Sequence, residues 1–427
     1  MITTTLIVLV VLIGLSIPIA AALGVTALIL DPLYSMLPLT RGMGDVAWNA
    51  STEFLLVAIP LFILLGEILL RAGFAENMYG AMSLWLSWLP GGLMHANIGA
   101  STLFAATSGS SVATAATVGT VAIPQIKRFG YNESLFLGSI AAGGTLGILI
   151  PPSINLVIYG VLTNASVPKL YLAGIIPGFA LAVMFMMAVV IVCQVKPSYG
   201  GQRVAGSWGE RLRSLRHLLP PVGIFLMVVG SIYMGLATPT EAAALGVFGA
   251  LILAAFSRRL TLPMLREALE GTMRSSVLIM LIIVAASFLN FVMAAIGLTT
   301  ALTEAVKNLG LSPGWMLVIV IIFYILLGTF METLSMMIVT VPVIAPLMFS
   351  LGYDPIWFGI VIIILVETVL ITPPVGLNLF VVQSLRKSGS MNSLIIGALP
   401  FVAMLFVMLA LLAFFPDLAL WLPRVFS

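Results

Sequence analysis

Two clusters of small and hydroxyl residues interrupt long apolar segments of this sequence. The first is Thr-Ser-Gly-Ser-Ser at residues 107–111, and the second covers residues 328–335 and includes Glu332. Hydroxyl and carbonyl oxygens are the ligands that a hard cation such as sodium prefers, and half-helix ends aim such carbonyls at an ion. The two clusters therefore favour an ion-binding centre inside a membrane.

A pair of adjacent prolines follows each cluster, at Pro151-Pro152 and Pro373-Pro374, with an offset of 373 − 151 = 222 residues. Proline lacks an amide donor and breaks a helix, and hydrocarbon offers no water to the freed carbonyl groups. Matching breaks in two halves of a chain are typical of transporter binding sites. The sequence predicts broken helices over residues 133–165 and 355–387.

Each cluster is expected to form the tip of a hairpin that meets the broken helix of its own half near the membrane centre. We predict that the substrate contacts Ser108, Gly109, Ser110, Ser111, Asn155, Glu332, Thr333 and Asn378. Sodium ligands, partly backbone carbonyls, are predicted in one set of Ser110, Ser111, Gly144, Gly147 and Pro151, and in a second set of Gly328, Thr329, Thr368, Thr372 and Gly376. The alternative is that these residues only allow close helix packing, as small residues do in membranes.

The composition is that of a polytopic membrane protein, because 61% of the 427 residues are hydrophobic and only 8% are charged. The net charge is +3, and the basic residues are scattered over short loops rather than clustered on one face, which argues against nucleic-acid binding. The single cysteine, Cys193, excludes an internal disulfide and a cysteine-based metal site. Motifs for ATP hydrolysis or membrane proteolysis are missing, so we predict no enzyme and no cofactor beyond sodium as coupling ion.

Membrane crossings are predicted wherever apolar runs are long enough. They fall near residues 3–30, 53–70, 133–165, 170–194, 218–235, 240–256, 275–296, 355–387 and 392–416. Two further segments, about 92–127 and 313–349, have polar centres, and we expect each to be a re-entrant hairpin of two half-length helices. Segments 75–88 and 299–309 are short and amphipathic, as interfacial braces or simple loops would be.

The positive charges test this topology. Fourteen of the eighteen Lys and Arg residues fall on one side, which is then cytoplasmic, with the N-terminus inside and the C-terminus outside. Lys307, on the outer side beside the second hairpin, is a predicted contact for a soluble receptor. No Lys or Arg falls at the predicted membrane centre, so an anionic substrate would depend on helix N-termini, hydroxyls and bound sodium.

The two halves repeat each other. Tyr131 and Tyr353, and likewise Pro124 and Pro346, share the 222-residue offset of the proline pairs. We therefore divide the chain into an N-terminal half at 1–195, a cytoplasmic linker at 196–217 and a C-terminal half at 218–427. The predicted fold is all-α, with inverted repeats that each contain one hairpin and one broken helix.

With these residues in view, the whole chain resembles the large membrane subunit (DctM-type permease) of tripartite ATP-independent periplasmic (TRAP) transporters. The similarity is most specific at residues 108–114, 147–153 and 372–378, and at 53–62. It implies a multi-pass protein of the bacterial inner membrane that imports organic acids with sodium by an elevator motion. It also implies two partners, a small membrane subunit of four helices and a periplasmic solute-binding protein.

Two other functions remain open at this stage. A stand-alone anion symporter or antiporter would share the inverted repeats, and a channel could share the re-entrant hairpins. Two acidic residues in apolar runs, Glu67 and Glu367, are also open to two interpretations: they could serve function or stabilise helix packing.

Overall fold

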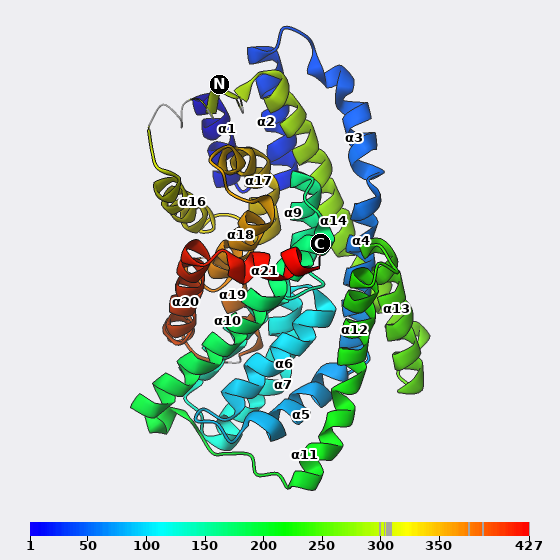
Figure 1. Cartoon of the computed structure of the whole chain (residues 1–427), viewed down its shortest axis with the longest axis vertical. Coiled ribbons are helices and arrows are strands. Elements are labelled where there is room, and N and C mark those ends of the chain that lie inside the picture. The colour runs from blue at the N-terminus through cyan, green and yellow to red at the C-terminus, as the bar shows by residue number, and fades with distance from the viewer. Residues whose placement is uncertain (299, 303, 305–309, 375, 387, 427) are drawn as a thin grey trace.

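The computed structural model describes the chain apart from residues 299, 303, 305–309, 375, 387 and 427, and every regular element in that part is a helix (Figure 1). Six of the described helices are long and apolar enough to cross a membrane. They are α4 (Ala58–Arg71, counted with the turn that begins at Phe54), α10 (Val167–Val195), α13 (Pro239–Phe256), α14 (Leu262–Ala295), α17 (Thr333–Ser350) and α20 (Met391–Phe414). The prediction of an all-α membrane protein with several spans is confirmed.

The N-terminal segment differs from its prediction. Instead of one crossing over residues 3–30, the chain forms α1 (Ile2–Gly14) and α2 (Ile19–Tyr34). Ser16 has a φ of 59°, and Pro18 precedes the new helix, so the chain reverses between them. The hydroxyls of Thr4 and Tyr34 then lie 2.6 Å apart. The single crossing is therefore wrong, and the start of α1 lies beside the end of α2.

The helices pack into two bundles, which lie side by side in Figure 1. The scaffold bundle consists of α2, α3 (Met43–Ser51), α4, α12 (Leu219–Tyr233), α13 and α14. The hairpin bundle consists of α6 (Leu93–Ser108), α7 (Ser111–Phe129), α8 (Glu133–Thr145), α9 (Ile154–Thr163), α10, α16 (Pro313–Leu327), α17, α18 (Pro355–Leu370), α19 (Leu377–Leu385) and α20. Within it, α8 of the first half packs extensively on α20 of the second half.

The hairpin bundle contains the same four-helix unit twice. Helices α6 and α7 form a hairpin that precedes the broken pair α8 and α9, and α16 and α17 precede the broken pair α18 and α19. Tyr131 and Tyr353 occupy matching places: Tyr131 OH accepts from Leu93 N at 2.9 Å, and Tyr353 OH donates to Pro313 O at 2.9 Å. Each tyrosine thus fixes the start of the hairpin in its own half.

Both predicted hairpin segments are helix pairs, but their arms are longer than the predicted half-length. The arms have 15 to 19 residues, which corresponds to a rise of about 22–29 Å. Such helices are nearly as long as a hydrocarbon core is thick, so an arm that reaches only the membrane centre must be strongly tilted. Helix α14 is also longer than predicted, because it begins at Leu262 rather than near residue 275.

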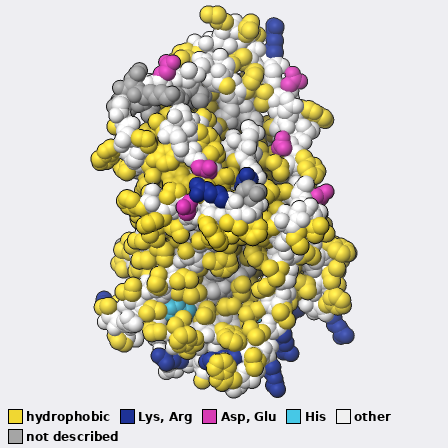
Figure 2. All heavy atoms as spheres, viewed as in Figure 1, with side chains coloured by type: hydrophobic (Ala, Val, Ile, Leu, Met, Phe, Trp, Pro, Cys, Tyr) yellow, Lys and Arg dark blue, Asp and Glu magenta, His cyan; other side chains and the backbone are white. Residues whose placement is uncertain are grey.

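Three short helices cover the bundles. Segment 75–88 forms α5 (Phe74–Leu86), and the linker at 196–217 contains α11 (Trp208–Ser214), whose Arg211 carbonyl accepts from the Trp85 indole at 3.1 Å. Helix α21 (Asp417–Val425) packs on α10. Most of the Lys and Arg seen in Figure 2 lie at the lower end, where α5 and α11 lie, below a largely apolar surface. Lys307 and much of segment 299–309 lie outside the described residues.

Candidate functional site

The first hairpin tip packs directly on the first helix break. A methyl group on Gly109 would lie 2.9 Å from Pro152 O, and one on Gly147 would lie 2.7 Å from Ser110 O and 3.0 Å from Ser111 N. Gly109 also has a φ of 61°, which favours glycine at the turn between α6 and α7. Backbone therefore meets backbone here, and no side chain separates the tip from the break.

Three helix N-termini point toward the same region, and each has a capping side chain. Ser110 Oγ accepts from Ala113 N at the start of α7, and Ser153 Oγ accepts from Leu156 N at the start of α9. The Glu332 carboxylate accepts from Leu334 N and Ser335 N, both at 3.1 Å, at the start of α17. These three ends carry partial positive charge, which favours an anion nearby, and at α17 the Glu332 carboxylate already is that anion.

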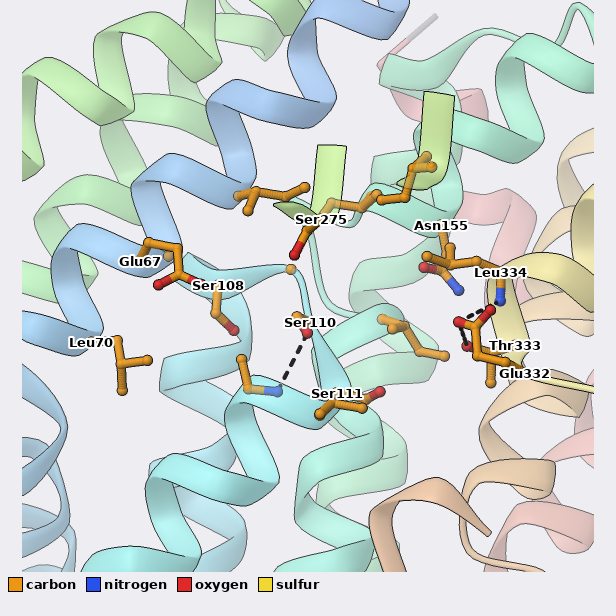
Figure 3. A pocket seen from close by; sticks show the side chains of 18 residues that line it. Glu67, Leu70, Ser108, Ser110, Ser111, Asn155, Ser275, Glu332, Thr333 and Leu334 are labelled. Atoms are coloured by element: carbon orange, nitrogen blue, oxygen red, sulfur yellow. Dashed lines mark hydrogen bonds between the residues drawn. The ribbon is translucent and has the colours of Figure 1, made fainter. Parts of the chain in front are cut away.

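A cavity of about 180 Å³ lies between these tips and the scaffold bundle (Figure 3). Ile63, Gly66, Glu67 and Leu70 of α4, with Ser275 and Ile279 of α14, form one wall. The opposite walls come from the first tip, the first break and the start of α17. Seven predicted substrate residues line it, namely Ser108, Gly109, Ser110, Ser111, Asn155, Glu332 and Thr333. Among the described residues that line it, none is Lys or Arg, and two, Glu67 and Glu332, are acidic.

Asn378 is the predicted substrate residue that the structure places elsewhere. It is fully buried, and its Nδ2 donates to Ala141 O at 3.0 Å. Its Nδ2 would also lie 3.0 Å from a methyl group on Gly144. The reason is that α19 packs on α7 and α8, so the first turn of α19, which contains Asn378, faces α8 rather than the cavity. Asn378 therefore connects the second break to the helix that leads into the first break.

Four of the five residues in the first predicted set of sodium ligands lie around the first tip and the first break. Ser110, Ser111 and Gly147 are in direct contact, and Pro151 precedes the residue whose carbonyl faces Gly109. Gly144 lies before the break, in the last turn of α8, where its nearest neighbours are Ala115 and Asn378. Ser110 O already accepts from the Thr114 hydroxyl at 2.7 Å and from Thr114 N at 3.1 Å, so a cation would have to displace or share one of these bonds.

The second predicted set of sodium ligands lies at a helix break that is more exposed to solvent than the first break. Gly328 packs against Val369 of the second break. The hydroxyls of Thr329, Thr368 and Thr372 donate to backbone carbonyls three or four residues earlier in the chain, at 2.6–2.8 Å. A hydroxyl that donates in this way keeps its lone pairs for a cation. Pro373 and Pro374 are exposed, whereas the first break is buried throughout.

The scaffold wall of the cavity contains residues that the sequence did not assign to the site. Glu67 forms an ion pair with Arg71, and Arg71 Nε lies 3.5 Å from Glu267 Oε2. Only the position of Glu67 in an apolar run suggested it, because nothing in the sequence places α4 against α14 and the tips. Glu367 is fully buried, and neither of its oxygens has a hydrogen-bond partner among the described residues.

Comparison with known proteins identifies the family. The sequence matches the model of the family "Tripartite ATP-independent periplasmic transporter, DctM component" over residues 6–418. The chain belongs to this family. It is 36% identical over 385 residues to the C4-dicarboxylate TRAP transporter large permease protein DctM of Pseudomonas aeruginosa, with 90% of each chain covered. The resemblance seen in the sequence is therefore confirmed.

Other relatives of this permease bear different substrate names. The sialic acid TRAP transporter large permease protein SiaM of Vibrio cholerae is 33% identical and covers 88% of this chain and 87% of that protein. The ectoine TRAP transporter large permease protein TeaC of Halomonas elongata is 31% identical, with 86% of each covered. The crystal structure of the Alcanivorax borkumensis YdaH transporter matches with a TM-score of 0.60 at 15% identity, covering 98% of this chain and 99% of that one, and so shares the fold.

Proposed function

We propose that this permease imports a small organic acid by sodium-coupled movement of the hairpin bundle against the scaffold bundle. The observation that carries the proposal is the cavity between scaffold helices α4 and α14 on one side and both hairpin tips on the other. A substrate held there contacts both bundles, so relative movement of the bundles carries it across the membrane in an elevator motion.

Contacts between the two halves support movement of the hairpin bundle as one body. Gly138 of α8 touches the Gly397 carbonyl of α20 so closely that neither position has room for a side chain. Arg386, only 7% exposed, forms an ion pair with Glu133 at 2.8 Å. Elsewhere between the halves, Tyr159 OH of α9 donates to Pro355 O at the start of α18, at 2.7 Å. The halves are thus joined along their length.

The chemistry of the cavity supports an anionic substrate with a cation. The N-termini of α7 and α9 supply positive potential, whereas the N-terminus of α17 is already capped by the Glu332 carboxylate. The described lining contains two acidic residues, Glu67 and Glu332, and no Lys or Arg, so bound sodium would offset these carboxylates and attract the anion. Sodium would bind between each tip and its break, through the two predicted sets of oxygens. The relatives named for a C4-dicarboxylate, sialic acid and ectoine show that family membership alone does not define the acid.

The proposed setting is the bacterial inner membrane, with a small four-helix subunit and a periplasmic solute-binding protein as partners. The C-terminus is placed on the periplasmic side, as the distribution of basic residues indicates. The N-terminus needs a revised position. Since the α1–α2 reversal puts it beside Tyr34, it lies on the same side as Arg41, which the charge distribution makes periplasmic.

Reconstitution tests this function directly. Proteoliposomes with the permease, a small subunit and a candidate solute-binding protein should accumulate acid only under an inward sodium gradient. The matched control replaces external sodium by potassium. Equal uptake without any solute-binding protein would favour a stand-alone symporter of the same fold. Uptake that neither saturates nor needs a gradient would favour a channel.

A further inference from the structure

Gly66 on α4 is a point of close contact between the scaffold bundle and the first hairpin tip. A methyl group at this position would lie 3.0 Å from Ser108 Cα, 3.2 Å from Ser108 O and 3.3 Å from Ser108 Cβ. All three nearest atoms belong to the one residue that ends α6. The contact therefore joins a fixed helix to the segment that turns around the proposed sodium site.

Ser108 has no room to retreat from α4. Its hydroxyl bonds to the Thr114 hydroxyl at 3.0 Å, which ties it to α7. Behind it, Gly109 lies against Pro152 O and Gly147 lies against Ser110 O, so the tip rests on the broken helix. Scaffold, tip and break thus form three layers with a glycine at each contact.

Helix α4 itself does not need a glycine at this position. Gly66 lies within the helix Ala58–Arg71, and its φ is not in the left-handed region. Alanine is a better helix former than glycine, so the local preference of α4 would be for a side chain here. What explains the missing side chain is the close approach of Ser108.

We propose that Gly66 is the docking point at which the scaffold bundle holds the first hairpin tip in the conformational state seen here. A side chain at this position shifts the transporter toward its other state, because the tip is displaced from α4 while α4 stays folded. This inference rests on the proposed movement of the two bundles. Gly66 lines the cavity wall, but it acts as a positioning residue in this account, since its contact with Ser108 sets which state is populated.

Distances between spin labels test the proposal in the assembled transporter. In a Cys193→Ser background, one label replaces exposed Phe248 on α13 of the scaffold bundle, and one replaces exposed Phe179 on α10 of the hairpin bundle. Gly66→Ala and Gly66→Ser are compared with the matched control Gly223→Ala, because Gly223 lies within α12 and has nothing within 4 Å of an added methyl group.

We expect two label distances in the parent, and a change of roughly tenfold in their population ratio in both Gly66 variants, as overpacking by one methyl group would produce. The Gly223 control should match the parent. Two distances with unchanged populations in the Gly66 variants would overturn the docking role and leave the bundle movement standing. One invariant distance in every protein, with and without sodium and acid, would overturn both.

Discussion

Substitution at the contact between Gly138 and Gly397 tests most sharply whether the two halves pack together as one body. A methyl group on Gly138 would lie 2.8 Å from Ala398 N and closer still to the carbonyl group of Gly397. Ordinary contacts of a methyl group begin near 3.4 Å, so α8 and α20 would have to separate by at least 3.4 − 2.8 = 0.6 Å along their extensive contact. Overpacking of this kind costs about 1–3 kcal/mol, and the alanine regains about 0.5–1 kcal/mol of helix propensity.

We therefore expect Gly138→Ala and Gly397→Ala to lower stability by a net amount of about 0–2.5 kcal/mol, toward the upper end because the crowded atoms are backbone atoms. Gly24→Ala is the matched control, because Gly24 lies inside α2 with open space around it and should gain stability. The assay is the apparent Tm in detergent at one scan rate, since unfolding of such proteins is often irreversible. Equal or higher Tm values for the α8 and α20 variants than for the control would refute the reasoning.

Three further predictions concern the tip, the break and the contact between halves. Replacing Pro151-Pro152 by Ala-Ala should abolish transport at near-normal expression, because a continuous apolar helix is stable in lipid; uptake near the parent level would contradict this. Ser110→Ala should raise the sodium concentration for half-maximal uptake, and an unchanged sodium dependence would remove this hydroxyl from the ion site. Glu133→Gln should lower the Tm more than Arg386→Ala, because Arg386 is the more buried partner and would lose its carboxylate, keeping the neutral acceptors Ser390 O and Ser393 Oγ; the reverse order would argue against the ion pair.

Much of the fold could be predicted from local signals. The proline pairs in apolar runs predicted both helix breaks, because a missing amide donor interrupts the hydrogen bonds of any helix. The polar clusters gave both hairpin tips. The reversal after α1 was missed because the apolar run continues through Ser16 and Pro18, so hydropathy alone reads it as one span. The unusual length of α14 was missed because its first turns are charged.

The site could be predicted only where its residues come from the tips and breaks. Seven of the eight proposed substrate residues line one cavity, since each tip packs near a break. Asn378 was misplaced because the packing of α19 on α7 and α8 is a tertiary fact with no sequence signal. The scaffold wall, with Gly66 and Glu67, was missed for the same reason, because α4 and α14 are more than 190 residues apart in the chain.

The most direct test of the central claim is access to the cavity from each side of the membrane. Val112 lines the cavity at the first tip and is 39% exposed, so a cysteine can replace it in a Cys193→Ser background. If the cavity moves across the membrane, a membrane-impermeant thiol reagent should reach Val112→Cys from either side of oriented vesicles that contain the whole transporter. Sodium with the transported acid should slow the labelling. Labelling from one side alone under every condition, with no protection by sodium and acid, would contradict the account.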